Sequence, residues 1–255
     1  MTRIVFFLFL TLFISCRETR RYTPSQVFAH NDYVRDKPFF TAYEVGAGFI
    51  EADVFLENGE LMVAHHHREI VGGRTLEKLY LQPLATQIAK FKGNVCEDAR
   101  RKLVLMIDLK TEGVSTLHAI VDLLKKYPEL ITSPSLQFMI SGNVPDPQKW
   151  SNYPTYIFID GRPNISYTPD QLERILMIST SFPSVAKWDG HGPISEVEKK
   201  RIKSLLRDVH VKGKKLRFWA TPDFPAAWKH LMSLDLDVIV TDDVVALVEF
   251  LNKQD

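Results

Sequence analysis

The sequence predicts an α/β protein, a single-domain (β/α)8 barrel of the TIM type. From residue 27 onward, eight short apolar runs alternate with segments that can form helices, and this alternation is typical of parallel α/β folds. The length of 255 residues, 45% of them hydrophobic, suits one barrel with a full core. The competing prediction is an open doubly wound sheet, which usually carries a GxGxxG phosphate loop, and the sequence contains none.

The strands are expected where short apolar runs end in polar clusters, and the helices where longer segments repeat apolar residues at helical spacing. In chain order, the strands are expected at residues 27–29, 49–55, 103–107, 136–140, 156–159, 184–187, 216–220 and 238–240. The helices are expected at residues 39–45, 75–92, 115–127, 169–177, 195–212, 226–233 and 244–252. A hairpin extends the second strand, because Asn58-Gly59 is a strong signal for a two-residue turn.

The first 26 residues lie outside the predicted barrel. Residues 4–14 form an apolar run that is too short to span a bilayer as a helix, and it leads to Cys16. Residues 13–16 resemble the lipobox of bacterial lipoproteins, with Phe13 where leucine is more usual. We therefore expect an exported protein, anchored through a lipid on Cys16 to the bacterial cell envelope, in the periplasm or at the outer membrane. The alternative is a plain secretory signal. The expected segments are a signal peptide at 1–15, a tether at 16–26 and the barrel at 27–255.

Glu51 and Asp53 carry the prediction of function. They lie two positions apart in an apolar strand, so their side chains point to the same face. Two carboxylates on one buried face are unfavourable unless a positive charge lies between them. Oxygen ligands suit Mg²⁺ and Ca²⁺, so the pair predicts a site for one divalent cation. The alternative is an exposed edge strand, but residues 50, 52 and 54 make the other face apolar.

The histidine cluster at residues 65–67 is expected beside these acids, at the end of the returning hairpin arm. An ideal two-residue turn pairs His66 with Glu51 and favours His66 on the acid face. A bulge or a three-residue loop shifts the register by one residue and favours His65. Periodicity leaves both alternatives open.

Further polar residues are expected at the carboxyl ends of the strands, where barrel enzymes have their active sites. The candidates are His30, Asp108, Lys110, Trp219 and Asp242. Three carboxylates and a lysine suit a metal site that also holds an anion, and two histidines suit general acid–base catalysis. This combination favours phosphodiester cleavage. Trp219 is also compatible with the core, and Asp242 with an N-cap of the following helix.

Together these residues resemble the pattern of the glycerophosphodiester phosphodiesterases, within the superfamily of phospholipase-C-like phosphodiesterases. The resemblance extends from His30 to Asp242, and residues 29–33 and 74–84 are similar to the branch related to "altered inheritance of mitochondria protein 6". It implies Glu51, Asp53 and Asp108 as metal ligands. It also implies His30 and His65 as the acid–base pair, and so selects His65 over His66.

The sequence departs from the glycerophosphodiesterase pattern at two places. Asn31 stands where an arginine usually binds phosphate, and Asp108-Leu109-Lys110 replaces the usual Glu-x-Lys. Asp-Leu-Lys together with Trp219 is similar to the sphingomyelinase-D-like phospholipases. We expect Asn31, Lys110 and Trp219 to contact the substrate.

Two classes of function remain. The first is an exported metal-dependent phosphodiesterase acting on a glycerol- or lipid-derived phosphodiester or a lysophospholipid, either as a hydrolase or as a lyase that forms a cyclic phosphate. The second is a non-catalytic lipoprotein that binds a phosphorylated ligand. No nucleic-acid partner is expected, because the formal net charge is +1 and the sequence has no basic stripe.

Overall fold

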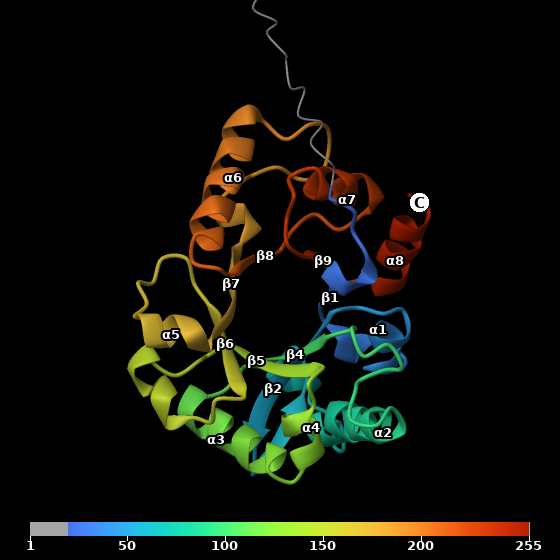
Figure 1. The fold of residues 1–255 in the computed structure, drawn as a ribbon, viewed down its shortest axis with the longest axis vertical. Coiled ribbons are helices and arrows are strands. Elements are labelled where there is room, and N and C mark those ends of the chain that lie inside the picture. Colours follow the sequence, from blue (N-terminus) through green and yellow to red (C-terminus); the bar gives the residue numbers. More distant parts are fainter. Residues whose placement is uncertain (1–19, 255) are drawn as a thin grey trace, which may run out of the picture.

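The computed structural model describes residues 20–254. Eight parallel strands form a nearly closed barrel with helices outside it, as Figure 1 shows, and this confirms the predicted fold. The order around the sheet is β8-β7-β6-β5-β4-β2-β1-β9, and β3 pairs with β2 alone. The strands are β1 Val27–Ala29, β2 Phe49–Glu57, β3 Glu60–Val63, β4 Leu103–Leu109, β5 Leu136–Gly142, β6 Ile157–Gly161, β7 Ile175–Ser181, β8 Lys215–Trp219 and β9 Ile239–Thr241.

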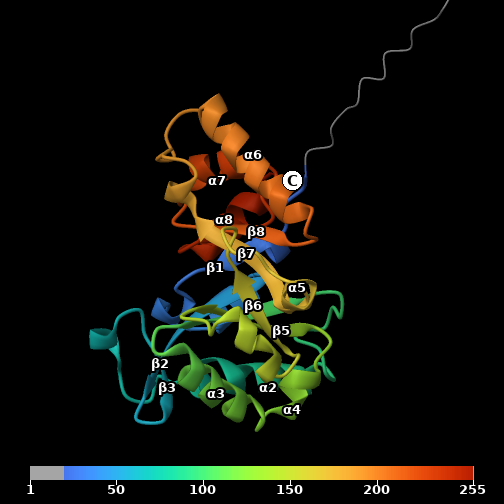
Figure 2. The same ribbon diagram turned by 90° about the vertical axis from the view of Figure 1, so that its left-hand side faces the viewer.

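The helices cover the outer face of the barrel (Figures 1 and 2). They are α1 Phe40–Glu44, α2 Gln82–Lys90, α3 Gly113–Leu124, α4 Pro128–Thr132, α5 Pro169–Arg174, α6 Glu196–His210, α7 Pro225–Met232 and α8 Val244–Asn252. A π-helical turn, Glu77–Leu81, precedes α2, and Pro83 lies in the first turn of α2, where its missing N–H costs little. Within residues 20–254, no helix has the length and apolar character needed to cross a membrane.

Strand alternation separates the outer core from the barrel interior. In β2, Ile50, Ala52 and Val54 are fully buried in the large cluster that packs against the helices. Phe49 faces inward, in a smaller cluster within the barrel. The members of that inner cluster are Phe28, Phe49, Val104, Met106, Met139, Met177, Val238 and Val240. These side chains fill the lower part of the barrel, so the polar inward residues lie above them, towards the carboxyl ends of the strands.

The sixth barrel strand is not where the sequence analysis placed it. Residues 184–187 are not a strand, and the helix expected at 169–177 ends at Arg174. The strand is β7, Ile175–Ser181, which pairs with both β6 and β8. Its sequence, Ile-Leu-Met-Ile-Ser-Thr-Ser, suits a strand by its β-branched residues. The apolar spacing that continues from α5 concealed the boundary, since a short apolar run does not distinguish helix from strand.

The hairpin has the predicted two-residue turn, but it is shorter than expected. Glu57 pairs with Glu60 and Val54 with Val63, and the ladder ends there. Nearer the start of β2, β1 pairs with the same edge at Phe49 and Ile50. After one further hydrogen bond, from the Ala64 N–H to the Asp53 carbonyl oxygen, the chain leaves the sheet, and the hairpin projects from the barrel (Figure 2). The register is that of the ideal two-residue turn, but the ladder ends before it reaches the histidines, so neither His65 nor His66 pairs with the acid strand.

Candidate active site

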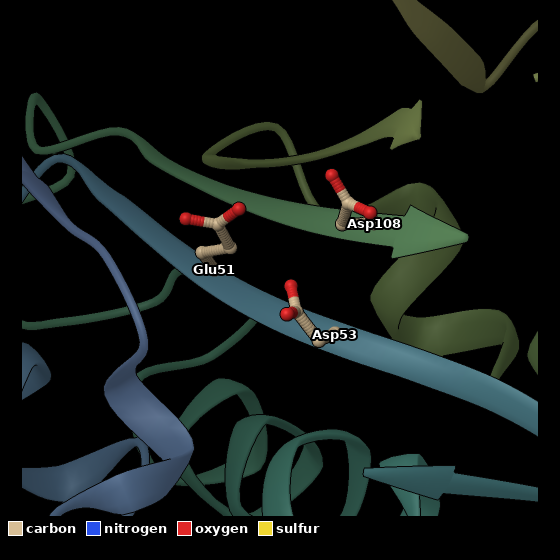
Figure 3. A group of neighbouring side chains, drawn as sticks. All are labelled: Glu51, Asp53 and Asp108. Atoms are coloured by element: carbon tan, nitrogen blue, oxygen red, sulfur yellow. The ribbon is translucent and has the colours of Figure 1, made fainter. Parts of the chain in front are cut away.

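Three carboxylates converge at the carboxyl end of the barrel. Glu51 and Asp53 come from β2, and Asp108 comes from β4, in register with Asp53 (Figure 3). One oxygen from each of the three lies within 4.8 Å of the others. Glu51 and Asp53 are only 4% and 2% exposed, so little solvent screens their mutual repulsion. Such a cluster needs a compensating positive charge.

Lys110 supplies part of that charge. Its ammonium nitrogen lies 2.9 Å from Asp53 Oδ2 and 3.0 Å from Asp108 Oδ1. Burial lowers the pKa of Lys110, but the two carboxylates outweigh it and raise the pKa overall. Burial also raises the pKa of the Asp108 carboxyl, against the opposing effect of Lys110. Lys110 is therefore held as a cation beside the acids.

Gly142 leaves room for Asp108. It adopts a left-handed backbone conformation at the end of β5, with φ of 72°. A Cβ at this position would collide with the Asp108 side chain and with the backbone of Leu109. A glycine is required here both for its conformation and for the close approach.

His30 is oriented by a carboxylate that comes from the other end of the chain. Its Nδ1 lies 2.7 Å from Asp242 Oδ1, and its Nε2 lies 3.8 Å from Glu51 Oε2. The hydrogen bond to His30 lowers the pKa of Asp242, so Asp242 is a carboxylate and Nδ1 carries the proton. The free Nε2 faces the acid cluster. Asp223 in turn accepts a hydrogen bond of 2.7 Å from the Asp242 backbone N–H.

Asn31 braces the same side of the site. It adopts a left-handed conformation with φ of 49°, which asparagine tolerates well. Its amide nitrogen donates to Asp242 Oδ1 at 3.1 Å. The Tyr33 hydroxyl lies 2.7 Å from Asn31 Oδ1 and 2.8 Å from Asp53 Oδ2. In this structure Asn31 thus contacts its own chain, and its predicted contact with substrate stays a prediction.

A buried arginine lies beneath the cluster. Arg217, from the middle of β8, is 3% exposed, with its guanidinium 4.0 Å from the centre of the Phe28 ring. It lies 3.6 Å from Glu51 Oε2 and 3.8 Å from Asp160 Oδ2. Asp160 also accepts hydrogen bonds from Ser141 and Ser179. Arg217 therefore places a fixed positive charge under Glu51, within the low-dielectric interior.

Trp219 lies at the mouth of the barrel, two residues beyond Arg217. The guanidinium of Arg162 lies 5.2 Å from the centre of its indole ring. Arg162 also donates to Asp160 Oδ2 at 2.8 Å. Trp219 is only partly buried, so it has a face available at the mouth rather than a place in the core.

Among the described residues, the histidine cluster makes no ion pair with the three acids, although it directly follows Ala64, whose N–H donates to the Asp53 carbonyl oxygen at 3.3 Å. His65, His66 and His67 are all exposed in the segment after β3. The rings of His65 and His66 contact each other, and His67 Nε2 lies 2.9 Å from Glu57 Oε1. The roles predicted for His65 and His66 stay predictions, since both side chains lie on the projecting segment.

Comparison with known proteins shows which proteins this chain is similar to. Residues 17–130 match the family described as "AIM6-like phosphodiesterase domain". An "altered inheritance of mitochondria protein 6 homolog" from Arthroderma benhamiae is 28% identical over 89% of this chain and 84% of that protein. The protein from Eremothecium gossypii is 24% identical over 89% of this chain and 69% of its own length. The resemblance to the AIM6-like branch is confirmed.

A solved structure agrees with the fold of this AIM6-like chain. A glycerophosphodiester phosphodiesterase from Parabacteroides distasonis superposes with a TM-score of 0.57, covering 90% of this chain and 97% of that chain. The sequences are 15% identical, so the likeness shows the fold alone. The structural likeness confirms the predicted TIM barrel, and the family match supports the coarse prediction of a phosphodiesterase-like domain.

The predicted localisation is wrong. The relatives of this AIM6-like chain are fungal proteins named for the inheritance of mitochondria, not lipoproteins of a bacterial envelope. The prediction depended on a short apolar run and an imperfect lipobox, a pattern that a few apolar residues and one cysteine can produce by chance. The predicted signal peptide and Cys16 lie outside the described residues.

Sequence reasoning missed several residues of the AIM6-like site. Asp242 was a candidate that was also compatible with an N-cap; Asp243 is the N-cap of α8, and the contact of Asp242 with His30 was not foreseen. Arg217 and Asp160 were not selected at all. Asp160 is the single charged residue of β6, and Arg217 lies between two apolar residues in β8, and that pattern was the available signal. Strand alternation places Arg217 on the same face as Trp219, towards the barrel interior.

The acid cluster fits a divalent cation. All three donors are carboxylates, the ligand type that Mg²⁺ and Ca²⁺ prefer. Glu51 Oε2 is buried without a hydrogen-bond partner among the described residues. A bound cation would satisfy that oxygen, which otherwise carries a desolvation cost. The structure supports a metal site without identifying the ion.

The pKa of Glu51 predicts how the stability of the metal-free protein depends on pH. Burial raises this pKa to about 7, although Arg217 opposes the shift, whereas an unfolded glutamate titrates near ~4.3. Between these values the folded protein holds a proton that the unfolded chain has lost. Raising the pH through this range therefore lowers the free energy of unfolding. We expect Glu51 to account for a loss on the order of 1–3 kcal/mol between about pH 5 and about pH 8.

Urea unfolding of wild type and Glu51→Gln at both pH values, with chelator present, tests this. The variant should lose less stability than wild type as the pH rises. An identical pH dependence in the two proteins would contradict the prediction.

Proposed function

We propose that this chain is a divalent-metal-dependent phosphodiesterase that hydrolyses a glycerol- or lipid-derived phosphodiester by histidine acid–base catalysis. The observation that carries the proposal is the set of three carboxylates within 4.8 Å of one another, with His30 and Lys110 beside them. This arrangement combines a cation site, an anion partner and a proton-transferring group. The family match to a phosphodiesterase domain supports the same chemistry.

Glu51, Asp53 and Asp108 would hold the cation, Mg²⁺ or Ca²⁺. When bound, it supplies Lewis-acid stabilisation of a phosphoryl oxygen. Lys110, in contact with Asp53 and Asp108, contributes a second positive charge. Arg217, fixed beneath Glu51, limits the repulsion among the carboxylates and the incoming phosphate.

His30 acts as the proton-transferring group on one side of the phosphate. In hydrolysis, its Nε2 takes the proton of a water molecule as the water oxygen bonds to phosphorus and the bond from phosphorus to the leaving oxygen breaks. Asp242 holds Nδ1 and stabilises the imidazolium that forms. We assign protonation of the leaving oxygen to His65, which would turn toward the site when substrate binds. In ligand-free structures, catalytic groups often lie further apart than they do in the complex with substrate.

A second reaction is possible on the same site if the substrate carries a hydroxyl next to the phosphate. That hydroxyl would then lose its proton to His30 and attack phosphorus, releasing the alcohol and leaving a cyclic phosphate. The Asp108-Leu109-Lys110 run and the partly exposed Trp219 favour this alternative, since both are similar to the sphingomyelinase-D-like phospholipases. The products distinguish a lyase from a hydrolase.

The non-catalytic alternative, a binder of a phosphorylated ligand, explains less of the site. Binding an anion requires positive charges, but it does not require a histidine whose tautomer is set by a carboxylate. His30, Asp242 and Asp223 form such a chain of contacts, with the free nitrogen directed at the acids. This orientation is useful for proton transfer.

A panel of glycerophosphodiesters and lysophospholipids, assayed with and without chelator, tests the proposed function. We expect turnover of at least one substrate that depends on Mg²⁺ or Ca²⁺ and disappears with chelator. Phosphorus NMR of the products separates a phosphomonoester from a cyclic phosphate. Binding of these compounds without any product would favour the non-catalytic alternative.

A further inference from the structure

A cavity lies at the opposite end of the barrel from the acid cluster. Its volume is 490 Å³, and its lining includes residues at the amino-terminal starts of five strands. Phe49 begins β2 and lines this cavity, whereas Asp53, four residues further along the same strand, lies in the acid cluster. Phe49, Val104 and Met177 form its apolar floor and belong to the inner cluster of the barrel. The inner cluster thus separates the two sites.

The lining of this cavity is strongly basic. Five cationic side chains from three separate segments line it, and no carboxylate does: Arg20, Arg100, Arg101, Lys102 and Lys215. Asp237 pairs with Arg20 and Asp98 with Arg100. Within residues 20–254, the other three cations have no ion pair. The net charge is close to zero over the whole chain, so this concentration is local.

Two of these cations have N–H donors without an acceptor among the described residues. Nε of Arg101 is buried and has no acceptor among the described residues. The Lys215 ammonium lies 5.7 Å from the centre of the Phe49 ring, over the cavity floor, and makes no hydrogen bond within residues 20–254. Like charges gathered around one concave space repel each other, and an anion would relieve that repulsion. Ser25, Gln26 and Gln137 add neutral polar groups to the lining.

We propose that this cavity, the basal cavity, binds a small anion of the phosphate class. The cations and polar groups bind the phosphate oxygens through charge-assisted hydrogen bonds, and the floor accepts a short apolar substituent. The same group could come from a soluble phosphate monoester or from the headgroup of an anionic phospholipid. The site is distinct from the proposed catalytic site and does not depend on a metal.

Methyl NMR of the full chain with ¹³C-labelled methionine tests the proposal, because Met177 lies on the floor of the basal cavity. Inorganic phosphate, glycerol 3-phosphate and short-chain phosphatidic acid are titrated in the presence of chelator. The titrations are repeated with Asp53→Asn, which disables the catalytic site but leaves the basal cavity intact. We expect a saturable shift of the Met177 methyl signal with at least one probe, in both proteins.

Lys215→Gln removes one unpaired cation and should weaken that binding by about tenfold. Lys200→Gln removes the same charge from the exposed face of α6 and should leave it unchanged. A response to phosphate or glycerol 3-phosphate identifies a soluble ligand, and a response to phosphatidic acid alone identifies a lipid headgroup. The proposal is overturned if no probe shifts Met177, or if Lys215→Gln and Lys200→Gln bind equally well.

Discussion

Asp53→Asn is expected to abolish tight binding of Mg²⁺ or Ca²⁺ and to lower metal-dependent turnover by about 100-fold or more. Asp53 is the central carboxylate of the cluster, since it lies in register with Asp108 and two residues from Glu51 on the same strand face. Removing even an outer-shell partner of a metal ligand typically costs about 10–100-fold, so loss of a ligand should cost at least as much. Isothermal titration calorimetry measures the affinity, and the substrate panel measures the turnover.

The fold should survive this change. Asparagine has the shape of aspartate and can still accept a hydrogen bond from Tyr33, while Lys110 keeps its contact with Asp108. The substitution also removes one negative charge and so reduces the repulsion in the metal-free cluster. Replacing a functional residue commonly raises stability in this way. Asp208→Asn is the matched control, because Asp208 is exposed on α6. Unchanged metal affinity in Asp53→Asn would exclude this cluster as the metal site.

His30→Ala is expected to lower turnover by about 10²–10⁴-fold with a much smaller effect on KM. In the proposed mechanism, Nε2 of His30 acts on the transition state, while the phosphate is bound mainly by the cation and Lys110. Asp242→Asn should cause a smaller loss and shift the pH profile. The charge of Asp242 helps to raise the pKa of His30, against the opposing effect of burial. His118→Ala, an exposed histidine on α3, serves as the control. Full activity of the His30 variant would rule out the proposed mechanism.

The same assay decides between the two histidines that follow the hairpin. His65→Ala should reduce turnover strongly, because the family resemblance assigns the second acid–base role to that position. His66→Ala should cost less than about tenfold, which corresponds to less than ~1.4 kcal/mol of transition-state stabilisation. A severe loss in His66→Ala together with an active His65→Ala would reverse the assignment.

Local sequence patterns were sufficient for the barrel and for two of its acids. The alternation of apolar runs and helical segments predicted eight strands. Each element must bury one face, and the spacing of its apolar residues shows whether it is a strand or a helix. Glu51 and Asp53 could be placed on one face from their spacing alone, since side chains alternate along any strand. The spacing of apolar residues did not reveal the boundary between α5 and β7, because both elements are short and the apolar residues continue across it.

The remaining parts of the site depend on contacts between residues far apart in the chain. His30 and Asp242 are 212 positions apart, and they meet only because β1 and β9 are neighbours in the barrel. Arg217 reaches Glu51 across the barrel interior. The position of the histidine cluster was decided by where the antiparallel ladder ends, at Val54 and Val63, two residues before His65. The sequence by itself determined the fold class, the shared face of Glu51 and Asp53 and the tight turn at Asn58-Gly59, because these follow from local backbone geometry. Only the tertiary structure decided which charges meet, because strand neighbours and register arise from packing of the whole barrel.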